Sequence, residues 1–233
     1  MSFFIKRFFG NLLSLIYPSL CVTCGRHLPA QSHYLCPVCL IQIPRTQFHL
    51  VQENFVEELF WGRVMIEKAS SFMYFTKGSK YQKLIHQLKY HGLKEIGFML
   101  GKMYGSELSS TPYSGADMII PVPLHPRKKR KRGFNQSEWI ALGLGESMDI
   151  PVRNSILKRN QNTPTQTRKS RFERWQNVEG AFVVDETEPL ENKKIILVDD
   201  VITTGATLEA CANALKRSAN VKIFIATLGV AWN

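Results

Sequence analysis

The chain has 233 residues, an apolar content of 44% and a formal net charge of +11 at pH 7. This length and composition suit one α/β domain with a small appendage and argue against a disordered chain. Residues 127–174 hold 13 Lys/Arg and four acids, so this segment alone carries +9. A concentrated positive face fits pyrophosphate, nucleic acid or an anionic membrane, and composition does not choose among them.

The N-terminal residues 1–17 are apolar enough to suggest a signal peptide. However, Lys6 and Arg7 interrupt the apolar run, and no small-residue cleavage site follows it. The run is also too short to span a bilayer, so we expect no integral membrane segment. We predict an amphipathic helix over residues 1–18 that packs on the protein, with a membrane-surface anchor as the alternative.

Four of the five cysteines form two Cys-x-x-Cys pairs separated by eleven residues: Cys21, Cys24, Cys36 and Cys39. Two such pairs predict a tetrahedral thiolate site for one structural Zn²⁺ within residues 19–43. So small a segment would depend on metal binding, typically ~10–16 kcal/mol, for its folding. The alternatives are two reactive dithiols or four buried thiols without metal. We expect His27 and His33 to be bystanders, and the chain to work in a reducing cytoplasm.

Residues 44–69 form a connecting region with a short helix near residues 55–60. A strand at residues 71–75 follows, then a helix from residue 80 that stops at Gly92, and another helix over residues 94–108. His86 and His91 lie near the end of the first of these helices, and we expect both side chains to be exposed rather than catalytic.

The next predicted strand, residues 117–124, leads directly into a run of six cations at residues 127–132. We interpret this run as a solvated loop or a nucleic-acid patch. A loop that leaves the carboxyl end of a parallel strand faces the ligand crevice of an α/β sheet. A helix over residues 136–148 follows. Beyond it come short strands at residues 156–157 and 181–184, separated by a long polar stretch of the kind that is functional or disordered.

The most informative stretch is residues 194–208. A β-branched strand at residues 195–198 ends in Asp199 and Asp200, a Thr-Thr-Gly-Ala-Thr turn follows, and a helical pattern covers residues 208–216. Backbone N–H groups and threonine hydroxyls at a helix start make a phosphate cradle, and Gly205 allows close approach. The carboxylates suit vicinal hydroxyls and Mg²⁺. The plainer alternative is an ordinary βα turn with an N-cap threonine. A last strand is expected at residues 221–226.

This stretch resembles the 5-phosphoribosyl-1-pyrophosphate (PRPP) motif of type I phosphoribosyltransferases. The cysteine pairs, Pro-Val-Pro-Leu at 121–124, Arg-Gly-Phe-Asn-Gln at 132–136, Thr-x-x-Gln at 163–166 and the acidic motif together resemble the competence protein F (ComF) family nearly end to end. The resemblance implies a type I phosphoribosyltransferase fold over residues 70–233. That fold is an α/β fold, a mostly parallel sheet flanked by helices, here with a small N-terminal zinc-binding segment.

The resemblance also implies roles for individual residues. Asp199 and Asp200 would be catalytic and orient the ribose, with Mg²⁺ bridging ribose and pyrophosphate oxygens. The 5′-phosphate loop would also include Thr203, Thr204, Gly205, Ala206 and Thr207. The pyrophosphate loop would use Arg127, Lys128 and Arg132. A flexible closing loop would contain Thr163, Gln166, Arg171, Arg174 and Asn177.

Two functions follow from the resemblance. One is a PRPP-binding protein that acts in DNA uptake or in DNA and nucleotide utilisation, with single-stranded DNA and competence or DNA-processing proteins as partners. The alternative is an enzyme that moves phosphoribosyl from PRPP to a nitrogen acceptor, similar to the transferase half of glutamine PRPP amidotransferase. The chain departs from that enzyme because it has no glutaminase domain. No general base stands out, and a nucleophilic amine acceptor would not need one.

Overall fold

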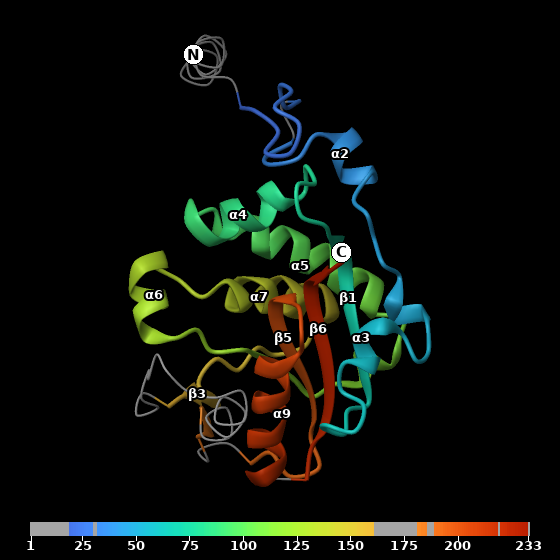
Figure 1. Ribbon diagram of the computed structural model, residues 1–233, viewed down its shortest axis with the longest axis vertical. Helices are drawn as coiled ribbons and strands as arrows, with labels where there is room; N and C mark the ends of the chain where they lie inside the picture. Colours follow the sequence, from blue (N-terminus) through green and yellow to red (C-terminus); the bar gives the residue numbers. More distant parts are fainter. Residues whose placement is uncertain (1–18, 30–31, 161–180, 186–188, 219, 233) are drawn as a thin grey trace, which may run out of the picture.

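A four-stranded parallel sheet forms the centre of the computed structural model, which describes residues 19–29, 32–160, 181–185, 189–218 and 220–232 (Figure 1). The strand order is β1-β6-β5-β2, and every neighbouring pair is parallel. A separate two-stranded antiparallel sheet pairs β3 with β4. The strands are β1 (Lys68–Phe75), β2 (Met118–Pro121), β3 (Leu157–Arg159), β4 (Phe182–Val184), β5 (Lys194–Ile202) and β6 (Lys222–Ala231).

Helices cover both faces of the parallel sheet (Figure 1). On β5, Ile196 and Val198 join the apolar cluster that contains helices α5 and α7, while Ile195 and Leu197 join the cluster that contains α9. Because successive side chains point to opposite faces, burial on both sides explains the unbroken apolar run that precedes the two acids. The helices are α2 (Pro37–Ile41), α3 (Phe55–Glu58), α4 (Gln82–Tyr90), α5 (Lys94–Leu108), α6 (Pro126–Arg132), α7 (Gln136–Met148) and α9 (Ala206–Ser218).

Helices α5 and α7 pack with their backbones in close approach. A Cβ atom at Gly143 would collide with the carbonyl oxygen of Phe98, and one at Gly101 would collide with that of Ile140. Only glycine fits such contacts without a shift of the backbone. These contacts fix α7 against α5, and Ser137 at the start of α7 contacts Asp199 near the carboxyl end of β5.

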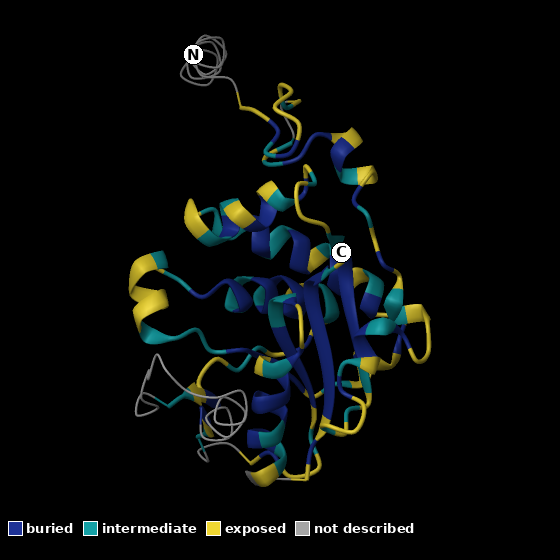
Figure 2. Ribbon diagram, in the orientation of Figure 1, coloured by how far each residue is buried: buried dark blue, intermediate teal, exposed yellow. Residues whose placement is uncertain are grey.

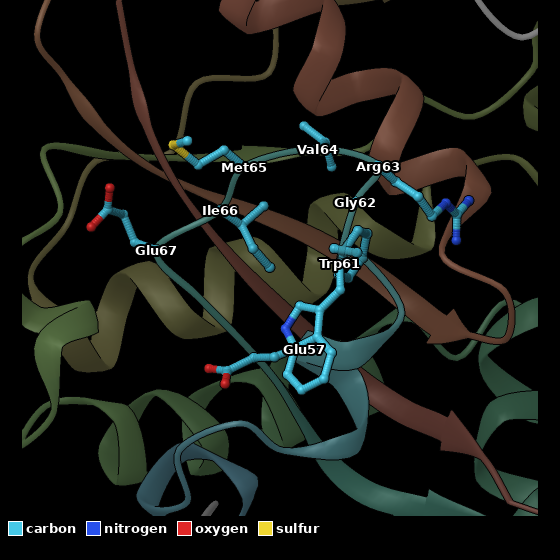
Figure 3. Close-up of a pocket in the computed structure, with 9 residues that line it drawn as sticks. Glu57, Trp61, Gly62, Arg63, Val64, Met65, Ile66 and Glu67 are labelled. Atoms are coloured by element: carbon cyan, nitrogen blue, oxygen red, sulfur yellow. The ribbon is translucent and has the colours of Figure 1, made fainter.

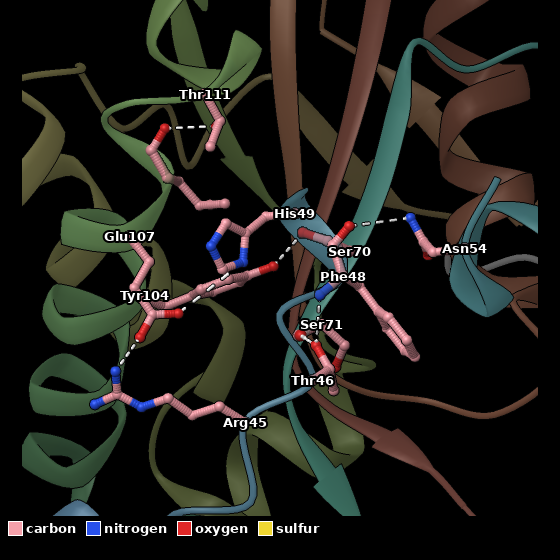
Figure 4. Close-up of polar contacts among 11 residues, drawn as sticks. Arg45, Thr46, Phe48, His49, Asn54, Ser70, Ser71, Tyr104, Glu107 and Thr111 are labelled. Carbon is pink, nitrogen blue, oxygen red and sulfur yellow. Dashed lines mark hydrogen bonds and ion pairs between the residues drawn. The ribbon is translucent and has the colours of Figure 1, made fainter. Parts of the chain in front are cut away.

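The connecting region covers the free edge of β1 (Figure 4). Thr46 N donates to the carbonyl of Phe72 at 3.1 Å, and the Asn54 side chain donates to the carbonyl of Ala69 at 3.0 Å. Arg45 also forms an ion pair with Glu107 of α5. An exposed strand edge would otherwise offer unpaired backbone groups to other chains. The connecting region therefore packs directly on β1 and α5. The predicted domain boundaries stay predictions.

The helices and strands predicted within the described residues are confirmed, with some shifts at their ends. Strand β1 begins at Lys68, three residues before the predicted start, and β5 continues through both acids to Ile202. His86 and His91 are exposed, as expected. None of the helices in the described part of the chain is long and apolar enough to cross a membrane. The predicted helix over residues 1–18 lies outside the described residues.

The basic run was predicted as a solvated loop or a nucleic-acid patch. The loop prediction is wrong, because residues 126–132 form helix α6. Pro126 occupies the first turn, and the ring nitrogen of His125 accepts from Arg127 N at 3.2 Å as an N-cap. Gly133 ends the helix with a left-handed φ of 83°. Proline at the start and glycine just past the end are favoured positions, and cations in the last turn interact well with the helix dipole.

Candidate functional site

The paired acids lie near the carboxyl end of β5 and are held from two sides. Asp199 Oδ1 accepts a hydrogen bond from Ser137 Oγ of α7 at 2.9 Å and one from Asp200 N at 2.8 Å. Asp200 Oδ2 lies 2.9 Å from Nζ of Lys89, which belongs to α4. The sequence alone did not indicate Ser137 or Lys89, because both lie far from the acids along the chain. For Ser137, the adjacent motif at residues 132–136 was a signal that could have pointed to it.

The two carboxylates influence each other. Burial, followed by the neighbouring negative charge of Asp200, raises the pKa of Asp199 to about 7. Bonds from Asp200 N and Ser137 act in the opposite direction and stabilise the anion. Near neutral pH the neutral form of Asp199 is therefore favoured more than in a free carboxyl group, and a bound cation would favour the charged form.

A pH dependence of stability follows from this shift. Because the pKa of Asp199 in the folded state lies above its unfolded value near 3.8, its contribution to stability is present at low pH and is lost as the pH rises through 7. Between pH 6 and pH 8, the ligand-free protein should lose about 1 kcal/mol more free energy of unfolding than the Asp199→Asn variant loses. Urea denaturation of both proteins at both pH values measures this difference. Parallel pH profiles would contradict it.

The turn after β5 forms a small polar cavity of about 50 Å³, which is lined by Asp199 and residues 201–208. The side chains of Thr203, Thr204 and Thr207 are exposed there, while Gly205 is buried and Ala206 begins α9. Gly205 has a φ of +74°, and a Cβ at this position would lie 3.1 Å from the ring of Phe60. Hydroxyls and free N–H groups at the start of a helix can bind a phosphate group.

Arg63 of the connecting region connects this turn to α9 and to the connecting region. Its Nη1 donates to the carbonyl oxygens of Leu59 at 2.7 Å and Thr204 at 2.8 Å, and its Nη2 pairs with Glu209 of α9. Arg63 also lines a pocket of about 550 Å³ formed by residues 57 and 60–67 (Figure 3). The shape of the turn therefore depends on the connecting region. The sequence of residues 194–208 does not indicate this dependence.

The basic helix α6 lies beyond the carboxyl end of β2, the strand next to β5, so it stands at the same edge of the sheet as the acids (Figure 1). Five of its cations, Arg127 to Lys131, are exposed (Figure 2). Arg132 is half-buried instead. Its Nη1 donates to Gln136 Oε1 at 2.8 Å, and its guanidinium lies 5.4 Å from the ring centre of Tyr90.

The residues predicted for the pyrophosphate loop and the flexible loop, and the two histidines predicted to be bystanders, have different outcomes. Arg127 and Lys128 point to solvent on α6, whereas Arg132 packs toward α4 and α7. The predicted flexible loop, with Thr163, Gln166, Arg171, Arg174 and Asn177, lies outside the described residues. His27 and His33 are exposed and do not belong to the cysteine cluster.

The four paired cysteines come together at the N-terminal end of the described chain. The sulfur atoms of Cys21, Cys24, Cys36 and Cys39 all lie within 4.8 Å of one another, and those of Cys24 and Cys36 are 3.8 Å apart. A tetrahedral zinc site with Zn–S bonds of ~2.3 Å has sulfur–sulfur edges of about 3.8 Å. The donor set therefore fits such a metal. Cys211, the fifth cysteine, is buried in α9, and burial raises the pKa of its thiol.

The thiols of this cluster differ in acidity. Burial raises the pKa of Cys21, but N–H groups of Cys36, Cys24 and Thr23 outweigh it and lower the pKa to about 6. Burial and then the neighbouring thiols raise the pKa of Cys39 to about 12. Without a cation, the cluster holds one thiolate easily and resists others, because the negative charges lie close together. A divalent metal removes this conflict.

A family model described as the phosphoribosyl transferase domain matches residues 125–229. The DNA utilization protein YhgH of Shigella flexneri is 30% identical over 205 residues, which cover 86% of this chain and 79% of that protein. Competence protein F of Haemophilus influenzae is 40% identical over 103 residues, which cover 43% of this chain and 44% of that protein.

Among solved structures, glutamine PRPP amidotransferase from B. subtilis, complexed with ADP and GMP, is 24% identical, with a TM-score of 0.36. The match covers 54% of this chain and 26% of that chain. The similarity to YhgH extends over most of both chains, and the matched phosphoribosyl transferase domain contains the paired acids and the turn that follows them. The chain therefore carries a phosphoribosyl transferase domain and belongs to the competence protein F family.

Proposed function

We propose that this protein binds PRPP with Mg²⁺ and acts in DNA uptake or DNA utilisation. One observation carries the proposal: two held carboxylates at the carboxyl end of β5 lead directly into a hydroxyl-lined cavity at the start of α9. This order matches a sugar diol followed by a phosphate. The names of the relatives, competence protein F and DNA utilization protein, support the cellular role.

In this proposal, each part of PRPP has its own binding residues. The acids Asp199 and Asp200 bind the ribose hydroxyls, and the turn of residues 203–207 binds the 5′-phosphate. Cations at the same edge of the sheet, Arg132 of α6 first among them, face the pyrophosphate. Bound Mg²⁺ would neutralise charge on the pyrophosphate and ribose oxygens.

Calorimetric titration of the protein with PRPP, once in the presence of Mg²⁺ and once in the presence of EDTA, tests the proposal. Tight binding only in the presence of Mg²⁺ supports it, and no binding in either condition refutes it.

The same geometry favours a second candidate, transfer of phosphoribosyl to a nitrogen acceptor. Departure of pyrophosphate from C1 of the ribose creates positive charge there, and the adjacent acids would stabilise it. Release of pyrophosphate from PRPP and Mg²⁺, measured across a panel of amines with and without single-stranded DNA, tests this candidate. Release that depends on one amine would establish turnover.

The exposed cations of α6 extend the proposal to single-stranded DNA. One pyrophosphate needs two or three cations, and Arg127 to Lys131 add five exposed ones beyond Arg132. If about four of them contact a strand, the log–log dependence of affinity on salt should have a slope of roughly −3.

We also propose that structural Zn²⁺ occupies the cysteine cluster and that the protein works in the cytoplasm with competence or DNA-processing proteins.

Reversing the charges of Lys129, Arg130 and Lys131 to Glu should abolish DNA binding and flatten the salt slope, while PRPP binding is largely kept. The three side chains are exposed on helix α6, and the variant leaves Arg132, the cation assigned first to the pyrophosphate, unchanged. Fluorescence anisotropy with a labelled oligonucleotide measures the change. The matched control reverses Lys102, Lys194 and Lys222, of which the last two start β5 and β6 at the opposite edge of the sheet. Equal effects of both triple variants would contradict a DNA site on α6.

A further inference from the structure

Lys89 stands where a ligand of the acids would have to bind. Its ammonium lies 2.9 Å from Asp200 Oδ2, and the other oxygen of Asp200 accepts from Val201 N at 2.6 Å. Both oxygens of this carboxylate are therefore engaged within the chain. A ribose hydroxyl or Mg²⁺ that approaches Asp200 meets a charge-assisted contact that it must displace or share.

The ion pair is placed so that it can open. The Lys89 side chain is 22% exposed and that of Asp200 is 14% exposed, so neither charge is sealed from water. Lys89 lies in the last turn of α4, which ends at Tyr90, and Gly92 follows with a left-handed φ of 74°. A lysine carries its charge on a flexible four-carbon stem, so the ammonium can move while the helix stays in place.

A second cation, Arg132, lies at the end of α4. Arg132 lies over the ring of Tyr90, the residue next to Lys89, with 5.4 Å between guanidinium and ring centre. The ends of α4 and α6 therefore meet beside the lysine that pairs with Asp200, so the second cation lies next to the chain segment that carries the first. Such a pair of cations suits an anion of high charge, such as a pyrophosphate group.

We propose that Lys89 is a movable counter-ion of this site. It neutralises Asp200 while the site is free of ligand, and it transfers to the pyrophosphate of PRPP when the ribose hydroxyls take its place on the carboxylate. This exchange of partners by Lys89 rests on the proposed binding of PRPP. It makes Lys89 a binding residue that discriminates between sugar phosphates with and without pyrophosphate.

The exchange predicts effects of opposite sign for two ligands. Ribose 5-phosphate needs the acids but brings no pyrophosphate, so Lys89 only competes with it. PRPP provides Lys89 with a new anionic partner, so the side chain contributes to binding. In Lys89→Met, which keeps the length and removes the charge, affinity for ribose 5-phosphate should rise about threefold to tenfold, while affinity for PRPP should fall about tenfold.

Calorimetry of the full-length protein at pH 8 with saturating Mg²⁺ measures both affinities. Lys83→Met is the matched control, because Lys83 is an exposed lysine on the same helix. Lys83→Met should leave both affinities unchanged, and Lys89→Arg should keep most of the affinity for PRPP. Thermal unfolding of each variant checks that the fold is intact.

Changes of the same sign for the two ligands would overturn the proposal, because a lysine that only positions Asp200 affects both alike. No change for either ligand would overturn it as well. Wild-type protein that binds neither ligand would instead refute PRPP binding itself and the exchange with it. Binding of both ligands by the wild type, with parallel losses in Lys89→Met, would remove the exchange and leave PRPP binding intact.

Discussion

Replacing Asp199 and Asp200 together with Asn should weaken PRPP binding at least about a hundredfold. Asparagine keeps the size of the side chain but removes the charge that Mg²⁺ and the ribose hydroxyls require. Each hydrogen bond to a charged group is worth about 1.5–3 kcal/mol, and about 1.4 kcal/mol corresponds to a tenfold change in affinity. Calorimetry with PRPP and Mg²⁺ measures the loss.

Inorganic phosphate separates this effect from damage to the turn. The backbone N–H groups of residues 203–207 remain in the double variant, so affinity for phosphate should change by less than about threefold. A control variant, Asp117→Asn with Glu146→Gln, removes two exposed acids from outside the site and should bind PRPP normally. Equal losses for PRPP and phosphate in the acid variant would point to a misfolded turn and against the assigned roles.

Removing metal from the cysteine cluster should unfold residues 19–43 while the sheet stays folded. The segment is small, and the described part of it contributes only three buried apolar cysteines and few other core residues. Apparent binding energies of ~10–16 kcal/mol for structural zinc sites are what stabilise segments of this size. We expect one zinc per chain by elemental analysis, and rapid proteolysis within residues 19–43 after chelation.

The variant Cys36→Ser with Cys39→Ser should reproduce the effect of the chelator, because it removes two of the four sulfur ligands. Cys211→Ala is the matched control, since this cysteine is buried in α9 and lies outside the cluster. It should retain one zinc per chain and a protected N-terminal segment. Metal-free wild-type protein in which residues 19–43 resist proteolysis would rule out a structural metal there.

Local patterns made part of the site predictable. The apolar run before Asp199 and the glycine in the following turn each have a local physical cause, namely burial on both sheet faces and a left-handed φ at Gly205. Lys89 and Ser137 could not be found in this way, because only the packing of α4 and α7 on the sheet brings them to the acids. The sequence around Lys89 does not differ from that of an ordinary helix, and Ser137 follows the 132–136 motif without being part of it.

Helix α6 was not predicted from the sequence for a different reason. Six adjacent cations repel one another and are typical of solvated segments, so the charge pattern favoured a loop. The end signals were nevertheless present, since Pro126 precedes the run and Gly133 follows it. Capping at His125 and Gly133 therefore outweighed the repulsion. Giving more weight to residues at the boundaries would have predicted the helix.

The strand order has a consequence for the way the protein is made. Strand β6 lies between β1 and β5, and Lys68 of β1 is aligned with Phe224 of β6. During synthesis, β1 and the connecting region that covers its edge emerge long before the strand on which they must pair. The sheet can close only when residues 222–231 have left the ribosome, and contacts between residues so far apart in sequence form slowly. A nascent chain therefore carries β1 without its partner, and a chain cut before β6 loses the strand that joins the two sides of the sheet.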